Sequence, residues 1–184
     1  MSRKKFPIRT LCQVALLIAI EVVLNRFGSI NTNGWKIGVS FLPLVLCAIL
    51  YGPWWAAGCG ALADFIGAML FPFGPYHPGF TICAALMGMV NGLFLHRKAA
   101  TKGRAFLNIL FATLINTLGI GLCVNTLWVA QLYGSKTYGG WFMYRLMEYA
   151  VLVPLHLLLV PVMQKLAQVL QSAGLAGEGR RTEK

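Results

Sequence analysis

Long apolar segments, separated by short polar connections, make up almost the whole chain. A membrane-spanning helix needs roughly 20 mostly apolar residues, because backbone polar groups in lipid must be paired within the helix. The chain is 58% hydrophobic and only 11% charged, which is too little charge for the surface of a soluble domain of 184 residues. The six apolar segments are residues 8–27, 37–51, 54–71, 79–95, 105–132 and 141–169. The sequence therefore predicts an all-α membrane protein with six transmembrane helices.

The two ends of the chain leave no room for a second folded domain. Residues 1–170 are expected to form a single six-helix transmembrane domain, and residues 171–184 a polar tail. The basic start, Arg3-Lys4-Lys5, and the apolar stretch after it resemble a signal peptide, but no small-residue cleavage site follows. Because Glu21 and Asn25-Arg26 stand there instead, the first segment is interpreted as a retained helix.

Lysine and arginine are distributed unevenly between the two sides of the predicted bundle. Twelve of the 16 lie at the two chain ends or in the connection after the fourth segment, and four lie on the other side. Since cytoplasmic segments carry the excess of basic residues, both termini and the tail are predicted to be cytoplasmic. Basic clusters beside apolar segments are typical of contact with an anionic lipid bilayer, so the net charge of +11 does not indicate a nucleic-acid partner.

Charged residues inside the apolar segments are expensive to bury, and each needs a partner or a function. In the sixth segment Trp141, Arg145, Glu148, Leu152 and His156 share one helical stripe, with Arg145 and Glu148 at i,i+3. One interpretation is an ion pair that fixes helix packing. The other is an anion-attracting cavity open to the outside, roofed by loops whose aromatic residues stack on a planar ligand. The spacing leaves both open.

Small residues form stripes on two further segments. Asp64 is the single carboxylate in the small-residue stripe of residues 57–68, which favours close helix packing. A second interpretation is that Asp64 accepts paired N–H donors from a ligand ring. Ala15 and Ala19 form an AxxxA pattern in the first segment, a weak signal because such patterns are common in membrane helices.

The sequence carries no motif for catalysis or for a metal. Walker, GxSxG and HExxH motifs are absent, so no enzyme activity is expected. The five cysteines stand singly in apolar stretches without metal-ligand spacing, and they are interpreted as small buried hydrophobic residues. His77 is interpreted as a loop residue and His156 as a structural hydrogen-bonding residue. No cofactor and no metal site are predicted.

One stretch carries a family resemblance. Residues 26–38, RFGSINTNGWKIG, continue into SFLP (40–43) and resemble the signature of the folate-family S components of energy-coupling factor (ECF) transporters. The similarity extends through LYGP (50–53), AD (63–64) and LFP (70–72) to YHPGFT (76–81). It is specific over residues 26–95, whereas over the fifth and sixth segments it rests on length and hydropathy.

The resemblance implies a vitamin-binding subunit of an ABC-type importer in the bacterial cell membrane. The S component captures a folate-type vitamin from outside, with the loop after the first segment as a lid. An ECF membrane scaffold subunit (EcfT) and two ECF ATPases supply the energy, and the face of Ala15 and Ala19 docks on the scaffold. The candidate substrate-binding residues are Arg26, Thr32, Lys36, Phe41, Asp64, Tyr76, His77, Phe80, Trp141, Arg145 and Glu148.

Folate chemistry agrees with the residues of the stripe and the signature. Folate joins a flat pterin and a benzoyl ring to a glutamate tail with a pair of carboxylates. Arg26, Lys36 and Arg145 suit the tail, and Asp64 or Glu148 suits the pterin amino group and the ring N–H beside it. The alternatives are an S component for another vitamin or planar heterocycle, and a small membrane enzyme that uses Asp64 or Glu148 with His156.

Overall fold

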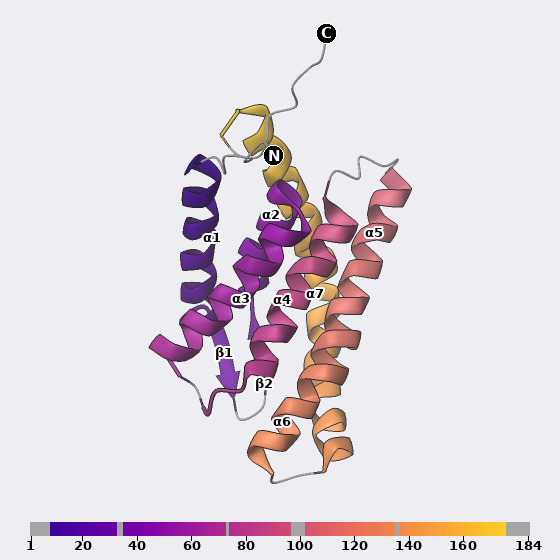
Figure 1. Ribbon diagram of the computed structural model, residues 1–184. Coiled ribbons are helices and arrows are strands. Elements are labelled where there is room, and N and C mark those ends of the chain that lie inside the picture. The colour runs from indigo at the N-terminus through magenta and orange to yellow at the C-terminus, as the bar shows by residue number, and fades with distance from the viewer. Residues whose placement is uncertain (1–7, 33–34, 73, 97–101, 135–136, 176–184) are drawn as a thin grey trace, which may run out of the picture.

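The computed structural model describes residues 8–32, 35–72, 74–96, 102–134 and 137–175, which form a bundle of helices with one small hairpin (Figure 1). The elements are α1 (Ile8–Arg26), β1 (Ser29–Thr32), β2 (Trp35–Gly38), α2 (Phe41–Tyr51), α3 (Pro53–Leu70), α4 (Pro78–Leu95), α5 (Lys102–Leu114), η1 (Ile115–Val124), α6 (Asn125–Tyr133) and α7 (Tyr138–Ser172). The helices α5, η1 and α6 follow one another without a break, so the bundle contains six helical rods, as the sequence predicted.

The length of the helices confirms a membrane protein. Four helical stretches are long and apolar enough to cross a membrane: Ile8–Arg26, Pro78–Leu95, Gly103–Leu132 and Tyr138–Ser172. The helix α2 is shorter than predicted, because the segment expected at residues 37–51 begins in β2 and becomes helical only at Phe41. Its 11 residues rise about 16 Å, roughly half the hydrocarbon thickness of a bilayer.

The connection after α1, which was expected to be a loop, contains a β-hairpin. The strands β1 and β2 pair antiparallel, with Ser29 opposite Gly38 and Thr32 opposite Trp35. Gly38 allows this approach, because a Cβ there would lie 2.6 Å from the Cβ of Ser29. The Ser29 hydroxyl donates a 2.5 Å hydrogen bond to the carbonyl of Asn25, which ties the hairpin to the last turn of α1.

Glycines allow α3 and α4 to pack closely. A Cβ at Gly60 would lie 2.5 Å from the Ala84 carbonyl oxygen, and a Cβ at Gly88 would overlap the backbone of Ala56. Small residues are what membrane helices use where their backbones approach. The small-residue stripe predicted on residues 57–68 therefore does pack against α4. At the start of the stripe the buried residue is Ala56, whereas Ala57 is only half-buried.

The cysteines divide into two groups. Cys47, Cys59 and Cys83 are buried, as predicted. Cys12 and Cys123 are exposed, so the prediction of burial was wrong for these two. Both lie on helix faces that no other part of the described chain covers.

The start of α1 and the end of α7 lie at the same end of the bundle, and the hairpin and α6 lie toward the other (Figure 1). We call the latter the hairpin end. At the opposite end the guanidinium of Arg9 donates to the carbonyls of Gly174 at 2.7 Å and Leu175 at 3.1 Å. Gly174 has a φ of +65°, a conformation that favours glycine in the turn that ends a helix. This contact ties the first helix to the last one.

Candidate functional site

The helix α7 presents the predicted polar stripe to the interior of the bundle. Trp141, Arg145, Glu148 and Leu152 are all buried, and His156 is half-buried. His156 shares a 2.9 Å hydrogen bond between Nδ1 and the Leu152 carbonyl, which agrees with the structural role predicted for it. The stripe is therefore an inward face of α7.

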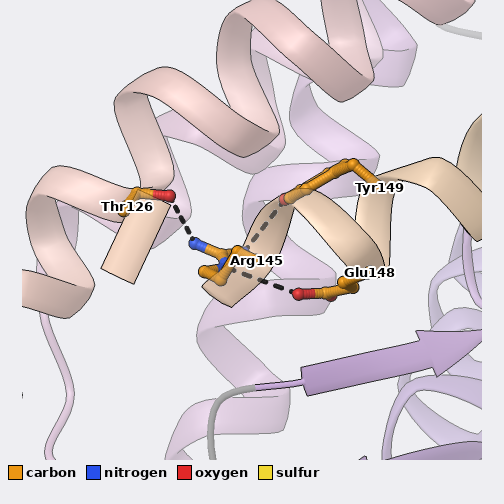
Figure 2. A network of polar contacts seen from close by, with 4 residues as sticks. All are labelled: Thr126, Arg145, Glu148 and Tyr149. Carbon is orange, nitrogen blue, oxygen red and sulfur yellow. Dashed lines mark hydrogen bonds and ion pairs between the residues drawn. The ribbon is translucent and has the colours of Figure 1, made fainter. Parts of the chain in front are cut away.

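Arg145 is the centre of a buried polar network (Figure 2). Its Nε lies 3.4 Å from Glu148 Oε2, an ion pair within one turn of α7. Its Nη1 donates to the Thr126 hydroxyl of α6 at 3.1 Å, and its Nη2 donates to the Tyr149 hydroxyl at 3.0 Å. The side chains of Arg145 and Glu148 are only 8% and 3% exposed, so the ion pair is almost completely shielded from solvent. The structure thus forms the ion pair that the packing interpretation predicted, and it also brings in two partners that the sequence did not suggest.

The helical segment η1 makes room for Tyr149. It is π-helical, a wide form of helix that is rare and is found frequently at functional sites. A Cβ at Gly121 would lie 2.6 Å from the Tyr149 hydroxyl oxygen, so the ring needs the missing side chain. Because the same hydroxyl accepts from Arg145, the conformation of η1 bears directly on the orientation of the guanidinium.

A second polar cluster joins α1, α3 and α4 near the hairpin. The Thr81 hydroxyl donates to Asp64 Oδ2 at 2.8 Å and lies 2.9 Å from the Tyr76 hydroxyl. Arg26, at the end of α1, lies in the electrostatic field of Asp64 and packs against Gly67, where a Cβ would be 3.0 Å from Arg26 Nε. Asp64 is half-buried, and both a hydroxyl donor (Thr81) and a cation (Arg26) lie near it.

His77 immediately precedes α4 as its N-cap residue, and its ring contacts α6. Its Nδ1 accepts the backbone N–H of Gly79 at 3.0 Å, so in the neutral ring the proton is on Nε2. The imidazole stacks on the indole of Trp128 with ring centroids 4.8 Å apart and an angle of 26° between the rings. Phe80 lies edge-on to His77 at 6.2 Å. His77 therefore lies at the end of the connection between α3 and α4, as the sequence indicated, and in addition it caps α4 and contacts α6.

The remaining predicted residues lie apart from these groups or cannot be placed. Thr32 is in β1 and Lys36 in β2, but their side chains lie outside the described part of the structure. Phe41 packs on the ring of His156, with centroids 3.7 Å apart, among core residues of α2 and α7. Ala15 and Ala19 are exposed on the outer face of α1.

Sequence reasoning missed Thr81, Thr126 and Tyr149 of the two polar clusters, and it missed Trp128, which stacks on His77. Thr81 belongs to the signature stretch, and Tyr149 follows Arg145 at i+4, so spacing alone could have indicated both. Thr126 and Trp128 carry no such signal, because their partners are on other helices. In the described ranges, no group of three or more His, Cys, Asp or Glu side chains could hold a metal ion.

These groups suit capture of a ligand by hydrogen bonding and stacking. The contacts described above provide guanidinium and hydroxyl donors, carboxylate acceptors and aromatic planes on α3, α4, α6 and α7. A few placed polar groups within apolar surroundings are typical of small-molecule sites. The fold and the site therefore define a membrane-embedded binding protein.

The comparison with known families agrees with this class. Residues 9–166 match the family described as "ECF transporter, substrate-specific component". The chain belongs to this family of transporter components, so it is an S component of the membrane rather than an enzyme.

Two relatives and a solved structure carry the name of one vitamin transporter. The folate transporter FolT of Clostridium novyi is 33% identical over 153 residues, which cover 83% of this chain and 86% of that one. FolT of Leuconostoc mesenteroides is 29% identical over 131 residues, 70% of this chain and 68% of that one. A crystal structure of FolT bound with folic acid matches with a TM-score of 0.78 and 30% identity, over 86% of this chain and 94% of that one. The chain is thus homologous to FolT and shares its fold.

Proposed function

We propose that this chain binds a folate-type vitamin from outside the cell and passes it to an ECF scaffold subunit and two ECF ATPases. The observation that carries the proposal is the match over most of both chains to a FolT crystallised with folic acid. The polar clusters at the hairpin end support it, because they offer donors, acceptors and aromatic planes to a ligand that has all three counterparts.

The proposal includes an orientation. The hairpin end faces outward, and both chain ends, including the polar tail after residue 170, are in the cytoplasm. Its support is the excess of lysine and arginine at the chain ends and in the connection after α4, together with the position of Arg9 beside the end of α7. Residues 1–170 then act as one transmembrane binding domain.

Within the site, we assign the cations to the glutamate tail and the carboxylates to the pterin. Arg26, Lys36 and Arg145 attract the tail. Asp64 or Glu148 accepts from the pterin amino group and the neighbouring ring N–H, a pairing that suits a carboxylate. The contribution of Thr32, Phe41, Tyr76, His77, Phe80 and Trp141 to ligand contact is part of the same proposal. A ring at the Tyr76 and His77 positions can stack on a flat ligand.

The face of α1 that contains Ala15 and Ala19 is assigned to the scaffold subunit. It is exposed along with its neighbours Leu16 and Val23, which are 61% and 54% exposed. Small side chains on an exposed apolar face allow another membrane helix to approach closely. Leucine at Ala15 and Ala19 should leave vitamin binding intact and abolish uptake in cells. Normal uptake by that double variant would place the docking face elsewhere.

Titration of the detergent-purified protein tests the ligand. Folate, riboflavin, thiamine and biotin are added separately in a calorimeter, and only folate is expected to bind. Arg26→Ala should weaken folate binding by more than about tenfold, which corresponds to about 1.4 kcal/mol. Arg104→Ala is the matched control, since Arg104 is exposed near the start of α5 and away from both clusters. If another vitamin binds and folate does not, the proposed ligand is wrong, whereas the assignment to the S-component family is unaffected.

A further inference from the structure

Two buried polar atoms of α6 have no hydrogen-bond partner. They are Asn125 Oδ1, an acceptor, and Trp128 Nε1, a donor, and neither pairs with any atom of the described residues. Buried polar groups in folded proteins are nearly always paired, and each exception calls for an explanation. Residues three apart share one helix face, so the orphaned acceptor and the orphaned donor lie on the same side of α6.

The surroundings of Trp128 hold its ring in place but do not satisfy its N–H. One face of the indole stacks on His77. Gly79 supports this contact, because a Cβ there would lie 2.5 Å from Trp128 Cε2. The thiol of Cys83 lies beside the indole, and its sulfur is at most a weak acceptor for the indole N–H. The ring is thus fixed while its donor has no oxygen or nitrogen acceptor among the described residues.

The position of α6 places these atoms between the two polar clusters. Thr126, between Asn125 and Trp128 in sequence, accepts from Arg145 and so joins α6 to the α7 network. His77 joins Trp128 to the start of α4, where Thr81 binds Asp64. Cys83 lies within the electrostatic range of Asp64 as well as next to Trp128. The helix α6 is therefore the element that connects the cation of α7 to the carboxylate of α3.

We infer that Asn125 and Trp128 are ligand-binding residues that recognise the edge of a planar heteroaromatic ring. Asn125 Oδ1 accepts from a ring N–H or amino group, and Trp128 Nε1 donates to a ring nitrogen or carbonyl oxygen. This inference rests on the proposed function, which supplies a ring with both kinds of group, and it assigns ring recognition to α6. The sequence signature, which ends before this helix, gave no role to either residue.

Unpaired groups give the inference a distinctive signature. Replacing an unsatisfied buried donor by an apolar group of similar shape is neutral or stabilising for the ligand-free protein, because nothing is lost and a desolvated N–H is removed. The same replacement removes a hydrogen bond from the complex. A residue with a purely structural role behaves differently, since its loss lowers stability and affinity together.

The test compares Trp128→Phe with Trp54→Phe. Phenylalanine at 128 keeps an aromatic face against His77 but has no N–H, whereas Trp54 is 79% exposed in the first turn of α3 and serves as the control. Folate affinity is measured by calorimetry, and the melting temperature is measured without ligand. We expect Trp128→Phe to weaken folate binding about five- to tenfold, the value of one hydrogen bond, with an unchanged or higher melting temperature.

A second variant, Asn125→Leu, removes the orphaned acceptor at similar volume and should give the same pattern. Unchanged folate affinity in both variants would overturn the inference, and so would a loss of affinity that is matched by a lower melting temperature. Failure of the proposed function is distinguishable, because in that case the unmodified protein itself does not bind folate.

Discussion

Gly121 is the position in η1 where an added methyl group has the least room. A Cβ there would lie 2.6 Å from Tyr149 Oη and 2.8 and 2.9 Å from Cε1 and Cζ of the same ring. At Gly119, two positions earlier in the same segment, a Cβ would meet no heavy atom of the described chain within 4 Å. Gly121→Ala and Gly119→Ala therefore add the same methyl group to the same helical segment, but only the methyl group at 121 meets a neighbouring side chain.

The expected magnitude follows from what must move. Overpacking of a dense core costs about 1–3 kcal/mol. If Tyr149 turns aside instead, its hydrogen bond from Arg145 is lost, and a bond to a charged group is worth about 1.5–3 kcal/mol. The higher helix propensity of alanine returns up to about 1 kcal/mol at either position. Because the propensity gain is the same at both positions, the free energy of unfolding of Gly121→Ala should be roughly 1–3 kcal/mol below that of Gly119→Ala, which should be unchanged or slightly higher than that of the unmodified protein.

Thermal unfolding of the two variants in detergent, at one fixed heating rate, measures the difference. A fixed rate is needed because membrane proteins often unfold irreversibly. Gly121→Ala should melt several degrees below Gly119→Ala and should bind folate more weakly, since Arg145 loses its orientation. Equal melting temperatures for Gly119→Ala and Gly121→Ala would refute the reasoning, because they would show that η1 yields to the methyl group without disturbing Tyr149.

Three further changes probe other contacts. Glu148→Gln leaves the charge of Arg145 buried without its carboxylate and should destabilise the protein by about 3–5 kcal/mol. Adding Arg145→Met should restore part of this stability. A Glu148→Gln variant as stable as the unmodified protein would contradict the buried ion pair. Gly88→Leu should prevent α3 and α4 from packing and should abolish the monodisperse peak in size-exclusion chromatography. A normal peak would show that the two helices are not in close contact at Gly88. Arg9→Ala should change the melting temperature little, because the contact is exposed, but should speed amide exchange in the last turn of α7; unchanged exchange would argue against the tie between the helices.

The helices were predictable because the bilayer dictates their length. Segments 8–27, 79–95 and 105–132 agree with the observed helices within a few residues, since each is an apolar run long enough to cross lipid. Segment 54–71 agrees equally well with α3. The inward stripe of α7 was predictable for a similar reason: charged residues in such a helix turn toward protein, so helical spacing identified the buried face.

The hairpin was missed although a signal for it was present. Asn33-Gly34 is a favoured pair for a two-residue hairpin turn, and Thr32 and Trp35 on either side of it are paired. The strands on either side have only four residues each, too few for a clear alternation of polar and apolar residues, so the stretch resembled a loop. The stack of His77 on Trp128 could not have been found this way. It joins two helices far apart in the chain, and no periodicity within either helix reports such a contact.

The pairing of charges in the proposed site removes the need for a ligand to neutralise them during folding. Arg145 has Glu148 at 3.4 Å, and Arg26 lies in the field of Asp64, so neither half of the site carries an isolated charge into the membrane. A guanidinium has five N–H donors, and in the described chain Arg145 uses one each on Glu148, Thr126 and Tyr149. Under the proposed function, ligand capture draws on the donors of Arg145 that these three contacts leave over. Removing the carboxylate of Glu148 has to weaken folding more than binding, whereas removing the guanidinium has to weaken both.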